Sequence, residues 1–509
     1  MSIKRQSLWS MAPLLVVSAV NIFSVPLFLH SLGPEMYALW FYVITFSGMF
    51  GFADLGLGVA VGRYIGVALG KNDHEAVRGY WGTGNLVILP FLTLVMLVFI
   101  GIGAWLGPKW FNVSPGNANL LRACFVAGGF GLFFGYYGQY WLILSQAHLD
   151  FKFVGLLGAG MSLLQVIPAL ALAILTRNPL VLVLWSALIG LLQLGIYIWH
   201  TRRKYHLGLD FRSASFARAR EMAAYIGKGF AGLISGSLLS SIDRVILGKL
   251  APATDFSYYT VSANLGGRLQ GLSVSVMGPV FHSTNRVFGS GREAASKIYN
   301  ETFFFVFEWY LFAAIWTGLW HPVLLRLWLT HTMGLKAGLE TAAHVGPLLV
   351  PLVIACCINA VANISGAQLG SLNRLGTQIG FSTTAGLLAM AGVWLGWNTD
   401  GVIGAAYGFL FSRIAFVAQD LYTIHLIKAG GWLDLHTWLK IGAQGMVGGV
   451  FALSYLWCQF DSYWLLIPAV LHGGLVATWL LRHSLRKLFA HDITSGNVRT
   501  IPLTPDPRP

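Results

Sequence analysis

The run Phe256–Phe281, FSYYTVSANLGGRLQGLSVSVMGPVF, is 26 residues long and carries one charge, Arg268. About 20 consecutive, mostly apolar residues are enough to cross a bilayer as a helix. The run therefore predicts a membrane helix with an arginine near its middle. Because an arginine at the bilayer centre costs about 2.5 kcal/mol or more, we expect Arg268 to face a water-filled or anion-binding interior.

The rest of the chain has the same apolar character. Hydrophobic residues make up 56% of the 509 residues and charged residues 10%, against about 25% charged residues in soluble domains. The predicted fold is all-α and membrane-embedded, with about 14 transmembrane helices. The expected spans are residues 8–30, 37–62, 83–106, 120–145, 154–176, 180–200, 223–248, 256–282, 299–320, 344–369, 377–396, 401–425, 438–457 and 464–483.

Lysine and arginine are unevenly distributed over the connections between these spans. With a cytoplasmic N-terminus, twenty-four of them fall on the cytoplasmic side and six on the opposite side. Cytoplasmic loops of membrane proteins carry such an excess, so we expect both termini in the cytoplasm. We interpret the net charge of +14 as a topology signal and expect no nucleic-acid partner.

Two distant parts of the chain resemble one another. Gly70–Tyr80 (GKNDHEAVRGY) and Gly289–Tyr299 (GSGREAASKIY) are offset by 219 residues. Spans one to six therefore look duplicated as spans seven to twelve, in the same orientation, as in transporters built from parallel repeats. The predicted domains are a six-helix bundle with a cytoplasmic loop (1–222), a second six-helix bundle (223–437), two additional helices (438–485) and a cytoplasmic tail (486–509).

Polar side chains recur at helical spacing on the span that holds Arg268. Ser257, Asn264 and Arg268 share one face with Gly271 and Ser275, which is untypical of a lipid-facing helix. We interpret Arg268 as an anion contact in a cavity, with a structural ion pair as the alternative.

Other polar residues inside the spans complete the set of candidates. A charge within a membrane span marks a functional site or a buried pair. The further candidate substrate contacts are Asn264, Arg244, Arg413, Asn359 and Asn363. The candidates for ion coupling or structural ion pairs are Asp54, Asp243 and Asp420.

Enzymatic motifs are absent from the sequence. There is no P-loop, no G-x-S-x-G and no cluster of histidine or cysteine with metal-binding spacing. The sequence therefore predicts a protein that is not an enzyme and has no cofactor or metal. Active transport would use a proton or sodium gradient, or consumption of the substrate on the far side.

Several short stretches resemble the Wzx-type polysaccharide flippases, in the wider group that includes multidrug and toxin extruders. These are Ser31–Tyr37 (SLGPEMY), Gly51–Gly58 (GFADLGLG) and Ser241–Gly248 (SIDRVILG), followed by Tyr258 and Tyr259. The resemblance covers spans one to twelve. It implies that the chain flips a polyprenyl-diphosphate oligosaccharide across the bacterial inner membrane, from the cytoplasmic to the periplasmic leaflet, by alternating access. The implied pathway is synthesis of O-antigen, capsule or exopolysaccharide, with membrane lipids and other polysaccharide-assembly proteins as partners.

Three alternatives stay open at this point. Lipid II flippases carry arginines in the first helix, whereas Leu8–Leu29 is uncharged here. Ion-coupled multidrug antiporters prefer cationic substrates, which an arginine-bearing cavity does not suit. A polytopic glycan polymerase or ligase has a large outer loop, and the longest outer segment here is 321–343.

Overall fold

The computed structural model describes residues 20, 24–54, 57–148, 150–209, 211–223, 227, 236, 241–287, 292–372, 374–427 and 473. Within these ranges the chain forms helices and no β-strand, as predicted. The expected spans over 438–457 and 464–483, and most of those over 8–30 and 223–248, lie outside the described residues.

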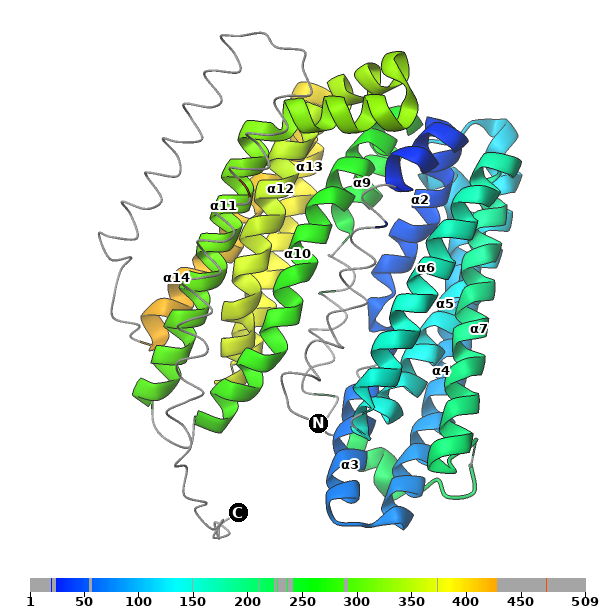
Figure 1. The fold of residues 1–509 in the computed structure, drawn as a ribbon, viewed down its shortest axis with the longest axis vertical. Coiled ribbons are helices and arrows are strands. Elements are labelled where there is room, and N and C mark those ends of the chain that lie inside the picture. The colour runs from blue at the N-terminus through cyan, green and yellow to red at the C-terminus, as the bar shows by residue number, and fades with distance from the viewer. Residues whose placement is uncertain are drawn as a thin grey trace.

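The described helices form two groups (Figure 1). The N-terminal bundle contains α2 (Pro34–Met49), η1 (Gly51–Asp54), α3 (Leu57–Gly70), α4 (His74–Trp110), η2 (Pro115–Asn117), α5 (Ala118–Ala147), α6 (Phe151–Thr176) and α7 (Pro179–Tyr205). The C-terminal bundle contains α9 (Ile242–Leu250), α10 (Ala253–Val287), α11 (Arg292–Met333), α12 (Leu335–Ser371), α13 (Leu375–Ser412) and α14 (Ile414–Ile427). The domain limits given above stay a prediction.

Six described segments are long and apolar enough to cross a membrane: 74–110, 115–147, 152–176, 179–205, 335–370 and 375–426. Large hydrophobic side chains such as Leu94, Leu97 and Leu188 are exposed on the outside of the bundles. A surface of this kind suits lipid rather than water. The Arg268 helix, α10, is 35 residues long but more polar than these segments.

The connection between α6 and α7 is short, in agreement with the expected spans 154–176 and 180–200. Arg177 takes the left-handed conformation with φ 48° and ends α6. The side chain of Asn178 then accepts a hydrogen bond of 2.9 Å from the backbone N–H of Leu180. Pro179 occupies the first turn of α7, where its missing N–H costs nothing.

Two expected spans are interrupted in the structure. The helix expected over 37–62 ends at Met49 and continues as the 3₁₀ turn η1 before α3 begins at Leu57. Glycines at 48, 51 and 56 weaken a continuous α-helix there. The helix expected over 401–425 is also wrong as one element, because α13 ends at Ser412 and α14 begins at Ile414. Arg413 lies at this break.

The boundary expected between 396 and 401 is confirmed by a sharp turn inside α13. Asp400 (φ −145°) and Gly401 (φ 56°) have non-helical backbone angles. The two arms of α13 then pack face to face, Gly396 against Gly404 and Gly392 against Gly408. A Cβ at Gly404 would overlap the carbonyl oxygen of Gly396, so the arms approach as closely as glycine permits.

The bundles contact each other through the start of α10 and the segment around α9 (Figure 1). Trp110 Nε1 donates a hydrogen bond to the carbonyl oxygen of Val245 (3.1 Å). The backbone N–H of Asn112 donates a hydrogen bond to the carbonyl oxygen of Gly248 (3.0 Å). The Tyr42 ring of α2 packs on Phe256 of α10 with centroids 4.5 Å apart. The predicted topology places this end on the outer side of the membrane, because the connections around 31–36, 107–119 and 249–252 all follow odd-numbered spans.

Candidate functional site

One face of α10 is directed toward the N-terminal bundle. The Ser257 hydroxyl donates a hydrogen bond of 2.7 Å to the carbonyl oxygen of Pro34, at the start of α2. The side-chain amide of Asn264 lies beside the hydroxyl of Tyr37, also on α2. Arg268 follows Asn264 by four residues and so lies on the same face, one turn further along. The polar face predicted from the spacing thus faces the space between the bundles.

The guanidinium of Arg268 is half-buried and pairs with no carboxylate among the residues that the structure describes. Asp243 and Asp420, two of the carboxylates considered as partners, have other neighbours in the C-terminal bundle. The side chain of Asp54, the third, lies outside the described part of the chain. A charge with five N–H donors therefore faces the inter-bundle space.

A cavity of about 270 Å³ lies inside the C-terminal bundle. Four of the predicted site residues line it together, although they are far apart in the sequence: Asp243, Arg244, Asn359 and Arg413. Gln270 from α10 and Ser382 from α13 add polar groups to its wall. We call this space the C-bundle cavity. Arg268 does not line it, although Arg244 in its wall is an electrostatic neighbour of Tyr37 on the inter-bundle face.

Asp243 is the acidic residue of the C-bundle cavity. Its side chain is 3% exposed, and its Oδ2 accepts a hydrogen bond of 2.9 Å from the hydroxyl of Tyr259. Tyr259 is fully buried on α10. Because a buried carboxylate is costly unless it is hydrogen-bonded, Tyr259 stabilises the charge that faces the cavity.

Arg413 supplies the first of two positive charges in this cavity and is 8% exposed. Its guanidinium lies 4.1 Å from the ring centroid of Phe409 and 5.3 Å from that of Phe416. Its Nε donates to the Ser412 hydroxyl (3.1 Å). The two phenylalanines flank the break between α13 and α14, so cation–π contacts hold the arginine where the helix is interrupted.

Arg244 supplies the second positive charge. Its Nε is buried without a hydrogen-bond partner in the described structure, and the guanidinium is an electrostatic neighbour of Cys356 on α12 and of Tyr37 on α2. Neither arginine forms an ion pair with a described carboxylate. Asp243 is nevertheless close enough to act electrostatically on Arg413.

Asp420 belongs to a second buried polar cluster, on α14. Its side chain is 8% exposed, lies beside Ser365, and leaves Oδ1 without a described hydrogen bond. Ser365 in turn bonds the Tyr299 hydroxyl at 2.8 Å. Asp420 and Arg413 are thus in separate surroundings, as expected for two residues seven positions apart. Asn363 lies on α12 one turn beyond Asn359 and does not line the C-bundle cavity.

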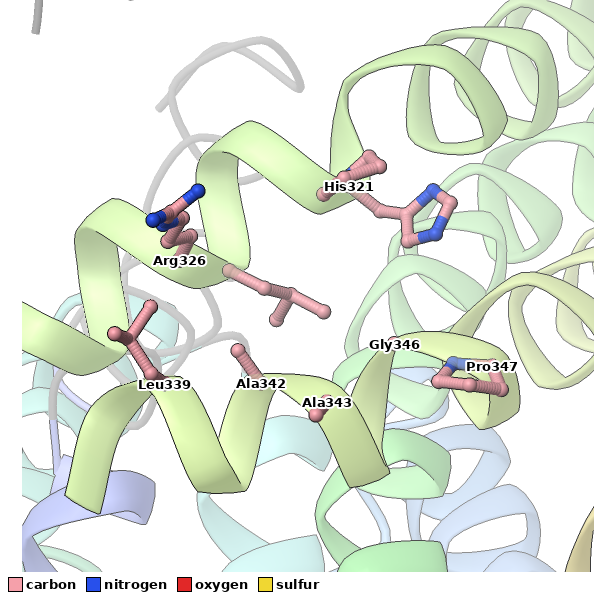
Figure 2. Close-up of a pocket in the computed structure, with 9 residues that line it drawn as sticks. His321, Arg326, Leu339, Ala342, Ala343, Gly346 and Pro347 are labelled. Carbon is pink, nitrogen blue, oxygen red and sulfur yellow. The ribbon is translucent and has the colours of Figure 1, made fainter. Parts of the chain in front are cut away.

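Figure 2 shows a further cavity of about 400 Å³, between the end of α11 and the start of α12. His321 and Arg326 are its polar residues, and the rest of its wall is mostly apolar, including Leu339, Ala342 and Pro347. None of the predicted site residues lies there. The described residues contain no group of three or more histidine, cysteine or acidic side chains that could hold a metal.

One charged cluster lies where α6 begins and α7 ends. Asp150 accepts hydrogen bonds from His200 Nε2 (3.0 Å) and the Tyr205 hydroxyl (3.1 Å) and forms an ion pair with Lys204. Burial raises the pKa of Asp150, but the hydrogen bonds from Lys204 and His200 outweigh it and hold this pKa below its usual value. The cluster joins two helix ends at the membrane surface.

The family model described as "Polysaccharide biosynthesis protein" matches residues 3–284, more than half of the chain. The chain belongs to this family. No curated protein matched it in a search of whole sequences.

The solved structures similar to this chain are membrane transporters. A lipid II flippase, MurJ, in an inward closed conformation has a TM-score of 0.66 at 12% identity, covering 96% of this chain and 99% of its own. An inward-facing multidrug resistance MATE family transporter of the MOP superfamily has a TM-score of 0.65 at 13% identity, covering 82% and 98%. A MOP superfamily transporter from Pyrococcus furiosus has a TM-score of 0.62 at 14% identity, covering 84% and 95%. At such identities these structures show a shared fold.

Family and fold together confirm the predicted class. The chain is a multi-pass membrane protein of a polysaccharide biosynthesis family, and it shares its fold with a MATE family transporter and with the lipid II flippase MurJ. The resemblance to Wzx-type flippases agrees with the family that matches.

Sequence reasoning missed several residues of the C-bundle cavity. Gln270, Ser382 and Cys356 are uncharged lining residues on three different helices, and Tyr259 does not line the cavity but bonds Asp243 in its wall. Tyr259 appeared in the sequence only as part of an aromatic pair opening a span. Its contact with Asp243, 16 residues away, depends on how α9 and α10 fold back on each other.

Proposed function

We propose that this protein flips an anionic lipid-linked oligosaccharide, with a polyprenyl-diphosphate anchor, from the cytoplasmic to the periplasmic leaflet of a bacterial inner membrane by alternating access. Its pathway would be the synthesis of a surface polysaccharide. Arg268 is the residue that carries this proposal. It is a half-buried cation on the face of α10 that lies toward α2, without a described acidic partner.

The chemistry of the substrate matches this face. A diphosphate accepts charge-assisted hydrogen bonds from a guanidinium, which are stronger than those between neutral groups. Asn264, one turn before Arg268, offers an amide that bonds sugar hydroxyls as donor and acceptor. The polyprenyl tail needs no protein site, because it stays in the hydrocarbon of the membrane.

The contacts between the bundles agree with one state of an alternating cycle. Trp110, Asn112 and Tyr42 of the N-terminal bundle contact Val245, Gly248 and Phe256 at the end that the lysine and arginine distribution predicts to be outer. A cavity closed at this end receives substrate from the cytoplasmic side. We infer that these contacts separate when the glycan is released outside.

The test is delivery of glycolipid to the outer leaflet in cells that lack redundant flippases. Depletion of the protein should trap lipid-linked glycan on the inner leaflet. Arg268→Ala should abolish delivery and Arg268→Lys should keep part of it, because lysine preserves the charge without the bidentate geometry. Arg326→Ala, which removes a cation from the apolar pocket of Figure 2, is the matched control and should deliver normally.

Two results would overturn the proposal. Normal outer-leaflet delivery after depletion would remove the function, and normal delivery by a stably expressed Arg268→Ala protein would remove the role of this residue. Trapping of lipid II in place of a polysaccharide precursor would assign the protein to the lipid II flippases. Proton- or sodium-dependent efflux of cationic drugs would assign it to the multidrug antiporters.

A further inference from the structure

We propose that the C-bundle cavity, lined by Arg244, Arg413, Asn359 and Asp243, binds one small monovalent inorganic anion such as chloride. Arg268 does not line this site, and the proposal goes beyond the flipping of a glycolipid. Its occupant completes the charge balance of the C-terminal bundle.

The first observation is the charge of the cavity wall. Two guanidiniums and one carboxylate line it, and arginine does not lose its proton in proteins. The wall therefore carries one excess positive charge. A buried charge is stable only when it is paired and hydrogen-bonded, and no described carboxylate other than Asp243 lines this space.

The second observation is the arrangement of the donors. Arg413 is 8% exposed, and the only described hydrogen bond of its guanidinium runs from Nε to the Ser412 hydroxyl. Arg244 leaves its Nε buried without a described partner. Asp243 does not fill the gap, because it makes no ion pair with either arginine in the described structure and its Oδ2 is bonded to Tyr259. The donors are thus free for a ligand that accepts hydrogen bonds.

The third observation is the size of the space. The cavity measures about 270 Å³, below the range of about 300–1,000 Å³ of pockets that enclose drug-sized molecules. A water molecule occupies about 30 Å³ of the liquid, so an ion with part of its hydration shell fits. The aromatic rings of Phe409 and Phe416 line the cavity beside Arg413.

The experiment measures binding of radiolabelled chloride to the purified full-length protein in detergent, by scintillation proximity, with choline as the only cation and no glycolipid. We expect saturable binding of about one chloride per chain. Arg413→Gln should weaken it at least tenfold, and Arg413→Lys should weaken it less. Arg268→Gln removes a charge from the other face of α10 and should bind within twofold of the natural protein.

Several outcomes would overturn the inference. These are an absence of saturable binding, unchanged binding by Arg413→Gln, and loss of binding by Arg268→Gln, which would place the anion between the bundles. Displacement of chloride by inorganic phosphate at lower concentration would assign the cavity to phosphate-bearing ligands. If Arg413→Gln does not fold, Arg244→Gln replaces it with the same expected loss, judged on protein that is monodisperse on a sizing column. Because no glycolipid is present, this result stands apart from the outcome of the flipping assay.

Discussion

Replacing Tyr259 with phenylalanine removes a single hydroxyl, the donor to Asp243 Oδ2 at 2.9 Å. The tyrosine is fully buried and the carboxylate is 3% exposed, so the substitution leaves a buried carboxylate without this donor. Hydrogen bonds to charged groups contribute about 1.5–3 kcal/mol. In a chain of this length each kcal/mol lowers the melting temperature by about 1–2 °C, since the entropy of unfolding grows with size.

We therefore expect the melting temperature of Tyr259→Phe in detergent to fall by about 2–6 °C. The melting temperature is measured by the change in intrinsic fluorescence on heating. Tyr258→Phe is the matched control. The Tyr258 ring stacks on His344 with centroids 4.9 Å apart, and this contact survives loss of the hydroxyl. The control should melt within about 1 °C of the natural protein, the usual range of neutral substitutions.

A double-mutant cycle makes the test specific to the charge. In an Asp243→Asn background the hydroxyl bonds a neutral amide, a contribution of about 0.5–1.5 kcal/mol. The loss caused by Tyr259→Phe should therefore be about half as large as in the natural protein. If Tyr259→Phe melts like the natural protein, or if Asp243→Asn leaves its effect unchanged, the hydrogen bond to a buried carboxylate is the wrong explanation.

Two further predictions concern other parts of the chain. Gly404→Ala places a methyl group against the carbonyl oxygen of Gly396 and should destabilise the protein by about 1–3 kcal/mol. The control is Gly380→Ala on the same helix, whose methyl group meets nothing within 4 Å and which should be neutral. Equal yields and melting temperatures for both variants would contradict the close approach of the two arms of α13. At Asp150 the depressed pKa means that the carboxylate stabilises the fold above its unfolded pKa of about 3.9, and that this contribution is lost as the pH falls through the lower folded value. Melting temperatures measured from pH 7 down to pH 3 should fall less steeply for Asp150→Asn than for the natural protein, and parallel curves would show that the cluster with Lys204 does not act in this way.

The residues of α10 show how much of the site the sequence contains. Ser257, Asn264 and Arg268 recur at helical spacing, and this spacing alone predicted a polar face. The structure places Ser257 and Asn264 against α2. Periodicity is enough to predict which side chains share a face, because the geometry of a single helix is fixed. In the structure this polar face packs toward the other bundle.

Arg413 shows the limit of the same reasoning. The surrounding residues, Leu410, Phe411, Ile414 and Phe416, include no glycine or proline, so the sequence reads as one continuous helix. At the break the Arg413 guanidinium lies between the rings of Phe409 and Phe416, an arrangement that exists only in the folded chain. The C-bundle cavity was missed for a similar reason, because its wall comes from α9, α10, α12, α13 and α14 together.

The glycines of α13 were predictable in part from the sequence. Gly392, Gly396, Gly404 and Gly408 form two pairs with the spacing that promotes close helix packing. Spacing identifies a face suited to close approach, but it does not name the partner. The turn at Asp400 and Gly401 decides that the partner is the other arm of the same helix.

The two candidate sites share one helix, and this has a consequence for transport. Gly267 and Gln270 of α10 face the C-bundle cavity, while Asn264 and Arg268 lie on the face toward α2. A rotation of α10 that moves Arg268 must therefore change the wall of the cavity as well. We expect charge in the C-bundle cavity to bias the position of Arg268, so that exchanging chloride for gluconate alters the rate of glycolipid delivery by the natural protein. Arg413→Gln should deliver at a rate independent of the anion, and an equal response of both proteins to the exchange would show that the two faces of α10 act separately.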